Sequence, residues 1–79
     1  MPRFYFHLRN DLSVNDEEGQ VLPDQEAAMM LARKYAREMA AASILDHGRI
    51  NLQHRIEVVD EVRETAFIVE YKDVVEIKG

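Results

Sequence analysis

The feature that most constrains the fold is one long helical pattern in the middle of the chain. Asp24 is suited to cap the start of a helix, and Glu26 lies in the first turn, where the helix dipole favours an acid. The pattern predicts a helix that runs to about Leu45 or Asp46, with Gly48 as its terminator. At 100° per residue, one face is rich in alanine and comprises Ala28, Leu31, Ala32, Tyr35, Met39, Ala42 and Ser43. Because alanine is small, this face predicts a helix that approaches a sheet closely.

The opposite face of this helix is mostly polar. It comprises Glu26, Met30, Arg33, Lys34, Arg37 and Ile44. Met30 and Ile44 are the apolar exceptions. They are either ordinary surface residues or members of a contact between subunits.

The chain before the helix has the pattern of three extended segments. Residues Arg3 to Arg9 alternate with period two, which predicts a strand with two different faces. A short second strand is predicted at residues 12–14, and Gly19 suits a turn with positive φ. Residues 20–22 are extended, and Pro23 ends them. The first strand is predicted to turn Phe4, Phe6 and Leu8 towards the core, and its other face carries Arg3, Tyr5, His7 and Arg9.

Two further strands are predicted after the helix, beyond a loop at residues 47–53. The first runs from His54 to Val59, with Ile56 and Val58 facing inward. The second runs from Glu64 to Tyr71 and is apolar on both sides, which is typical of a central strand or of one with a second buried face. One side of this strand carries Thr65, Phe67, Val69 and Tyr71. The other side carries Ala66, Ile68 and Glu70. A short final segment with Val74, Val75 and Ile77 forms an edge strand or a docking tail.

These elements predict a single α+β domain over residues 1–79. The order is β-β-α-β-β, with one long amphipathic helix packed on a three- or four-stranded antiparallel sheet. A single helix and a single sheet must cover one another, because each has one apolar side to bury.

Composition narrows the class of protein. A chain of 79 residues buries a small core, and without cysteine it has neither disulfides nor thiolate metal sites. Small domains without such cross-links are often stabilised by a partner subunit, which favours a homodimer. The net charge of −5 disfavours binding to nucleic acid, because phosphates attract basic surfaces. No apolar run has the length of a signal peptide core or a membrane span, so we expect a cytoplasmic protein that does not bind membranes.

The polar residues do not form a recognisable catalytic or metal-binding motif. No serine lies in a G-x-S-x-G turn, and Ser43 lies inside the predicted helix. His47 and His54 are seven residues apart, which is not the spacing of a zinc motif. We therefore expect no enzymatic activity, no metal and no cofactor.

The strongest candidate for a functional surface is the polar face of the first strand, formed by Arg3, Tyr5, His7 and Arg9 and called here the N-terminal row. Such a row is compatible with a solvent-exposed sheet face paired with Glu57, Glu64 or Glu70 across strands. It is also compatible with binding of nucleic acid or a phosphorylated ligand. In a third interpretation, Tyr5 joins Tyr71, Ile68 and Ala66 on a partly apolar sheet surface that is buried in a symmetric dimer.

Several segments together resemble a known family. They are Met1-Pro2-Arg3-Phe4-Tyr5-Phe6-His7-Leu8, the run from Asp16 through Glu18-Gly19 and Leu22-Pro23-Asp24 to Ala27, and the ending at residues 55–60 and 73–77. The chain resembles short bacterial proteins of unknown function that begin M-P-R-[YF]-[YF]-F-H. The resemblance implies a small α+β domain and supplies no activity. The residues favour a non-enzymatic interaction or regulatory module that forms a homodimer, with nucleic-acid or phosphorylated-ligand binding as the alternative.

Overall fold

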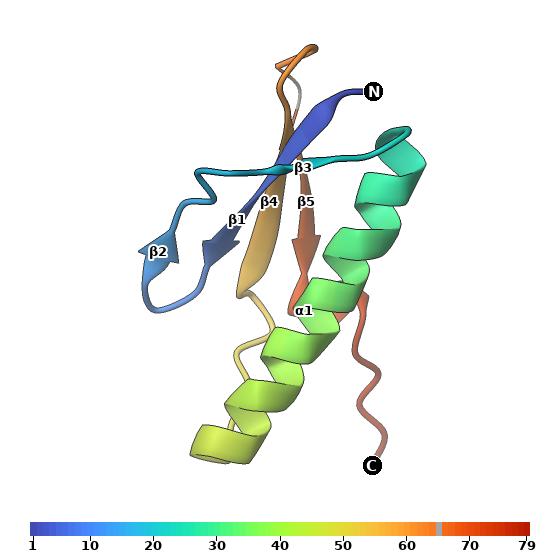
Figure 1. The fold of residues 1–79 in the computed structure, drawn as a ribbon. Helices are drawn as coiled ribbons and strands as arrows, with labels where there is room; N and C mark the ends of the chain where they lie inside the picture. Colours follow the sequence, from blue (N-terminus) through green and yellow to red (C-terminus); the bar gives the residue numbers. More distant parts are fainter. Residues whose placement is uncertain (65) are drawn as a thin grey trace.

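The computed structural model describes residues 1–64 and 66–79. It consists of two layers, a five-stranded antiparallel sheet and one helix that crosses a single face of it (Figure 1). In chain order the elements are β1 (Arg3–Arg9), β2 (Ser13–Val14), β3 (Gln20–Val21), α1 (Gln25–His47), β4 (Arg55–Asp60), β5 (Ala66–Glu70) and a 3-10 turn (Tyr71–Asp73). The predicted α+β class is confirmed, with an additional strand, because the extended segment at Gln20–Val21 also joins the sheet.

The N-terminal strand β1 lies inside the sheet. Along one edge it pairs with β4 over its length, from Phe4 opposite Asp60 to Arg9 opposite Arg55. Its other edge is shared by two short strands, β2 at one end and β3 at the other. The strand β5 pairs with β4, which gives the order β2-β1-β4-β5.

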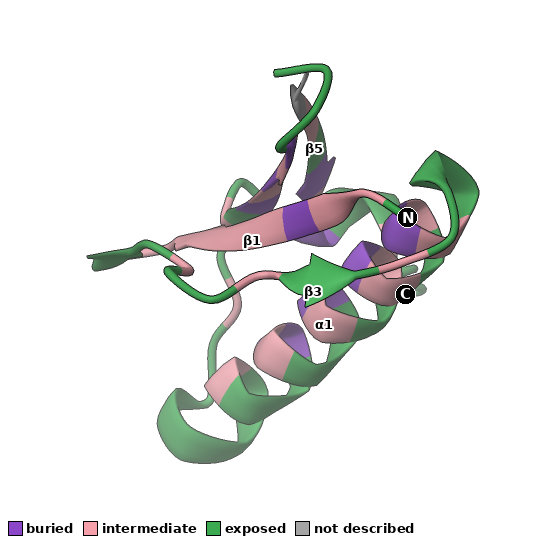
Figure 2. Cartoon of the chain, turned by 45° about the horizontal axis from the view of Figure 1, so that its top comes forward, coloured by how far each residue is buried: buried purple, intermediate pink, exposed green. Residues whose placement is uncertain are grey.

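The core lies between α1 and the sheet (Figure 2). Alanines spaced four residues apart form the line of contact on the helix, and they are fully buried: Ala28, Ala32, Ala36 and Ala40. Opposite them lie the buried side chains of Phe4, Ile56, Val58, Val69 and Tyr71. The close approach predicted from alanine is therefore present.

The predicted face of α1 is wrong in part. Ala42 is exposed, whereas Ala36 and Ala40, which the pattern omitted, are buried. The helix is rolled so that its smallest side chains occupy the line of closest approach to the sheet. Tyr35 and Met39 are too large for that line, and they lie half-buried beside it.

Both predicted ends of the helix are confirmed at the atomic level. The carboxylate of Asp24 accepts a hydrogen bond of 2.8 Å from the amide of Ala27. Gly48 adopts φ 68°, and its amide donates to the carbonyl of Ile44 at 2.8 Å. These contacts satisfy backbone groups that the ends of a helix leave without partners.

The second half of the sheet differs from the sequence prediction at its ends. The strand β4 begins at Arg55 and ends at Asp60, one residue later than predicted at each end. Glu64 lies in the turn before β5, with φ 55°, because the chain coils around Asp60 before it becomes extended. Thr65, which the prediction placed in this strand, lies outside the described residues. Tyr71 is buried but belongs to the 3-10 turn.

The C-terminal segment forms no strand within the described residues. Val74 and Val75 pack against the core, and Ile77 is exposed. Arg37 holds the segment to the helix by donating to the carbonyl of Val74 at 3.1 Å. The docking-tail prediction therefore describes this segment better than the edge-strand prediction.

Candidate functional site

The side of the sheet opposite α1 carries the N-terminal row. The strand register places the row beside residues of the neighbouring strands, and together they form what we call the open face. No helix or strand among the described residues lies over it (Figure 2), and the loop at residues 15–19 reaches its border. Its members are Arg3, Tyr5, His7 and Arg9 on β1, Arg55, Glu57 and Val59 on β4, and Ile68 and Glu70 on β5.

Both arginines at the ends of the N-terminal row are paired with carboxylates. The Nε of Arg9 lies 3.0 Å from Oε1 of Glu57 on β4. The Nε of Arg3 lies 3.9 Å from Oε2 of Glu61, and its Nη1 donates to the carbonyl of Glu18 at 2.7 Å. The predicted partner Glu57 is thus confirmed. The charge of the row is largely neutralised within the chain.

The other two glutamates predicted as partners of the row do not pair with it. Glu64 lies in the turn before β5. The carboxylate of Glu70 lies 3.8 Å from the ammonium of Lys72. The alternation of residues predicted that the strand starts at Glu64, whereas the turn includes Glu64 and removes it from the sheet.

The middle of the row is held by the loop at residues 15–19. This loop spans the gap that β2 and β3 leave along the edge of β1. The carboxylate of Asp16 occupies that gap, accepting from the amide of Phe6 at 3.1 Å and from the amides of Glu18 and Gly19 at 3.1 and 3.0 Å. The amide of Asp16 in turn donates to Nδ1 of His7 at 3.0 Å. A side chain therefore satisfies the part of the β1 edge that lacks a strand.

These contacts change the acidity of Asp16. Desolvation by burial tends to raise its pKa, but the backbone donors of Gly19, Phe6 and Glu18 outweigh that effect. The net result is a lowered pKa, because hydrogen bonds to the ionised form favour it. Asp16 is therefore a structural carboxylate that stays ionised.

His7 has a fixed orientation. The bond from the amide of Asp16 makes Nδ1 an acceptor, so the proton of the neutral ring is on Nε2. The ring also stacks on Tyr5, with centroids 6.4 Å apart and planes 10° apart. Tyr5 and His7 thus present a rigid surface, which loses little entropy when a partner covers it.

Gly19 completes this arrangement because of its close approach to β1. Its φ is 68°, and a Cβ atom there would lie 2.8 Å from the carbonyl oxygen of Phe4 and 2.9 Å from Cγ of Arg3. Only glycine combines a positive φ with so little space. The positive φ was predicted from the sequence, but the close packing was not.

We expect Gly19→Ala to lower the free energy of unfolding by about 2–3 kcal/mol, of which the left-handed backbone accounts for about 1. Gly48→Ala is the matched control, since Gly48 has the same φ of 68° but open space around it. Urea denaturation of both variants measures the difference. Equal losses in the two variants would contradict a packing role for Gly19.

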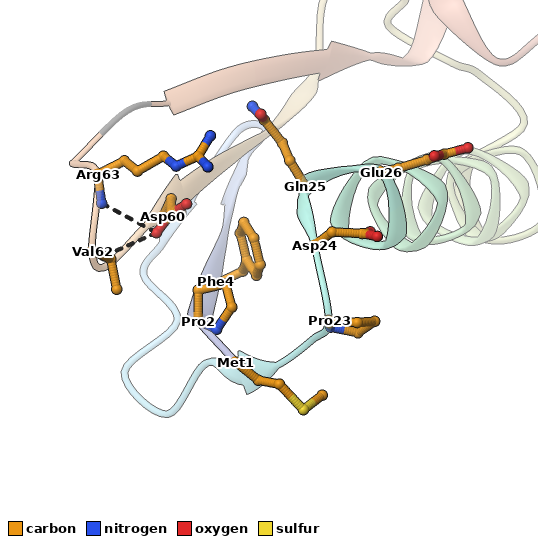
Figure 3. A pocket seen from close by; sticks show the side chains of 10 residues that line it. All are labelled: Met1, Pro2, Phe4, Pro23, Asp24, Gln25, Glu26, Asp60, Val62 and Arg63. Atoms are coloured by element: carbon orange, nitrogen blue, oxygen red, sulfur yellow. Dashed lines mark hydrogen bonds between the residues drawn. The ribbon is translucent and has the colours of Figure 1, made fainter.

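A hollow at the start of α1 is lined by the acidic side chains Asp24, Glu26 and Asp60, together with residues of the N-terminus and of the turn after β4 (Figure 3). Asp60 is only 6% exposed, and its carboxylate accepts from the amides of Val62 at 2.8 Å and Arg63 at 3.3 Å. Asp24 caps the helix. The carboxylates of Asp60 and Asp24 thus shape a turn and a helix end.

A second hollow lies at the other end of α1 and brings together both candidate histidines. His47 and His54 line it with Asp11, whose carboxylate lies 3.4 Å from Nε2 of His54. The His54 ring meets the ring of Tyr71 edge-on at 5.7 Å, and burial raises the pKa of Tyr71. Within residues 1–64 and 66–79, no three His, Cys, Asp or Glu side chains are grouped to hold a metal ion.

The fold and this surface define a small two-layer α+β domain whose sheet is covered on one side. The chain belongs to the family of a domain of unknown function, DUF6894, whose model matches residues 3–72. That range includes the N-terminal row, Asp16 and Gly19, and the resemblance to a family of unknown function is confirmed at this level. No curated protein and no solved structure matches the chain. No helix in the described part of the chain has the length and apolarity to cross a membrane.

Proposed function

We propose that the protein is a non-enzymatic interaction module that associates with a second copy of itself through the uncovered part of its sheet. The observation that carries the proposal is the open face. A two-layer domain with one uncovered sheet face gains by burying that face against another subunit.

The chemistry of the open face supports a protein partner. Tyr5, Val59 and Ile68 give it an apolar component, and Ile68 is 50% exposed. Paired Arg–Glu groups surround them, with Arg9 bound to Glu57. Aromatic and arginine residues are enriched in protein interfaces, and a surface with both signs of charge complements itself across a two-fold axis.

The alternative, binding of nucleic acid or a phosphorylated ligand by the N-terminal row, has less support. Phosphates bind to guanidinium groups with free donors. Arg3 and Arg9 lie beside Glu61 and Glu57, and the whole chain has a net charge of −5. A ligand of this kind would have to displace carboxylates before it gained contacts.

The proposal predicts a concentration-dependent mass in light scattering, with a dimer at high concentration. We expect Ile68→Asp to weaken association at least about tenfold, which corresponds to about 1.4 kcal/mol, because it places a charge in the contact. Val62→Asp is the matched control, since Val62 is 75% exposed at a hairpin tip away from the open face. A monomer at every concentration would refute the proposal, as would equal losses in the two variants.

A further inference from the structure

The end of α1 extends beyond the sheet (Figure 1). A helix of 23 residues is about 35 Å long, whereas the seven residues of β1 span about 23 Å. The line of buried alanines accordingly stops at Ala40, although the helix continues to His47. Beside this last part of α1, next to the turn after β1, lies a hollow of about 260 Å³, which we call the α1-end hollow.

The α1-end hollow combines apolar and polar side chains. Met39 and Ala42 of α1 and Leu12 of the turn after β1 form its apolar part. Its polar part includes two carboxylates and two imidazoles, those of Asp11, Asp46, His47 and His54. An apolar wall with a few polar groups is typical of sites that bind small molecules.

A buried hydroxyl without a partner also lines the α1-end hollow. Tyr71 is only 1% exposed. Its hydroxyl forms no hydrogen bond within the part of the chain that the structure describes, yet no side-chain oxygen in that part is both unpartnered and sealed from solvent. The exposed part of Tyr71 therefore includes its oxygen, which faces the hollow. Because burial raises the pKa of Tyr71, this hydroxyl stays neutral and can accept a hydrogen bond.

The charges around the α1-end hollow favour a cation. Asp11 and Asp46 carry carboxylates, and the C-terminal end of a helix is the negative end of its dipole. His47 and His54 are charged only when they are protonated, and Arg49 lines the neighbouring hollow but not this one. At pH 8, where histidine is ordinarily neutral, the hollow therefore carries net negative charge.

The ring of His54 brings two of the acceptors to the same part of the hollow. Its Nε2 lies 3.4 Å from Oδ1 of Asp11. On another side it meets the ring of Tyr71 edge-on, with centroids 5.7 Å apart. A carboxylate oxygen and a phenol oxygen thus lie around one half-buried ring, with the apolar wall beside them.

We propose that the α1-end hollow binds a small organic ammonium ion with an apolar body. The ammonium donates to the carboxylate of Asp11 and to the hydroxyl oxygen of Tyr71, and the apolar body packs against Leu12 and Met39. An ammonium group with three donors can serve both oxygens and keep one bond to water. The acidic and histidine side chains are not grouped closely enough to surround a metal ion, so a larger cation suits the hollow better.

Three probes with one apolar body test the proposed charge of the ligand. Phenethylamine, 2-phenylethanol and 3-phenylpropanoate carry an ammonium, a hydroxyl and a carboxylate on the same phenylethyl group. We expect phenethylamine to bind the unmodified protein at pH 8 with a dissociation constant on the order of 1 mM, at least about tenfold more tightly than the alcohol. The carboxylate should bind most weakly, because the hollow repels it.

Amide shifts in NMR titrations measure these constants and locate the bound probe. The signals of Leu12 and Ala42 should move as the α1-end hollow fills. The signal of Lys34, which lies by a separate hollow on the outer side of α1, should not move.

Two variants test the residues that bind the ammonium. Tyr71→Phe removes only a hydroxyl, and we expect it to fold normally and to bind phenethylamine about tenfold more weakly. Asp11→Asn should weaken binding about threefold, since this side chain is 84% exposed. Tyr35→Phe is the matched control, because it removes a hydroxyl that binds Gln20 outside the α1-end hollow. Its affinity should change less than about twofold.

Each outcome decides for or against the site. Tighter binding of the amine that is weakened by Tyr71→Phe and not by Tyr35→Phe would support the proposal. Equal binding of the three probes would overturn it, as would shifts that do not saturate up to about 20 mM phenethylamine or full affinity in Tyr71→Phe. The result is independent of self-association, because α1 lines this hollow and the open face lies on the other side of the sheet.

Discussion

Asp16→Ala is expected to lower the free energy of unfolding by about 3 kcal/mol, because it leaves backbone amides of Phe6, Glu18 and Gly19 without their charged acceptor. For a domain of this size, that loss lowers the melting temperature by roughly 12–24 °C. Thermal denaturation followed by circular dichroism measures the shift. Glu17→Ala is the control, since it removes the adjacent exposed carboxylate, and we expect a change below about 0.5 kcal/mol.

The contribution of Asp16 depends on pH in a defined direction. Its pKa is lowered in the folded state, so the ionised form stabilises the fold. That stabilisation is fully present above the unfolded pKa of about 3.9 and is lost as the pH falls through the lower folded value. The difference in stability between the original chain and Asp16→Ala should therefore narrow when the pH falls from 5 to 3. An unchanged difference over this range would contradict the role of the ionised carboxylate.

Ala36→Leu is expected to have a comparably large effect. Ala36 is completely buried on the line where α1 meets the sheet, so a larger side chain must push the two layers apart. Overpacking of this kind costs about 3 kcal/mol. Denaturation by urea measures the loss, and Phe4, which is buried opposite the helix, reports loosened packing by NMR.

Ala41→Leu is the matched control for this substitution. It makes the same change on an exposed side of the same helix, where helix propensity is nearly unaltered. We expect the stability of this variant to remain within about 0.5 kcal/mol of the original chain. If both variants lost the same stability, the effect would come from the helix itself rather than from its contact with the sheet.

The parts of the fold that could be predicted from sequence are those set by local patterns. The limits of β1 were predicted correctly, since Phe4, Phe6 and Leu8 alternate strictly with polar residues. The start of α1 was also predictable, because the cap at Asp24 involves an amide only three residues away. Both features depend on neighbours in the sequence.

The roll of α1 was not predictable from periodicity, because alanine occurs on several sides of the helix. Candidates for the buried line included Ala27, Ala28, Ala32, Ala36, Ala40, Ala41 and Ala42. The shape of the sheet and the size of Tyr35 and Met39 decide among them. That information resides in residues far away along the chain.

The role of Asp16 was missed for a different reason. Its carboxylate binds backbone amides, and one of them belongs to Phe6, ten residues earlier. Because every residue except proline has a backbone amide, the sequence does not indicate which amides a carboxylate will bind. The one available signal was the spacing of Asp16 and Gly19. The sequence predicted only a turn at Gly19, and this segment also closes the edge of the sheet.

The place of β1 inside the sheet has a consequence for how the chain folds. Its main partner, β4, begins at Arg55, so the largest ladder joins the first residues of the chain to its last third. Such distant pairing is slow, because a long loop must close before the ladder gains stability. During synthesis, an emerging chain that has not reached Asp60 lacks the strand that completes its core. Folding is therefore a late event, and fragments that end within α1 are expected to stay unfolded.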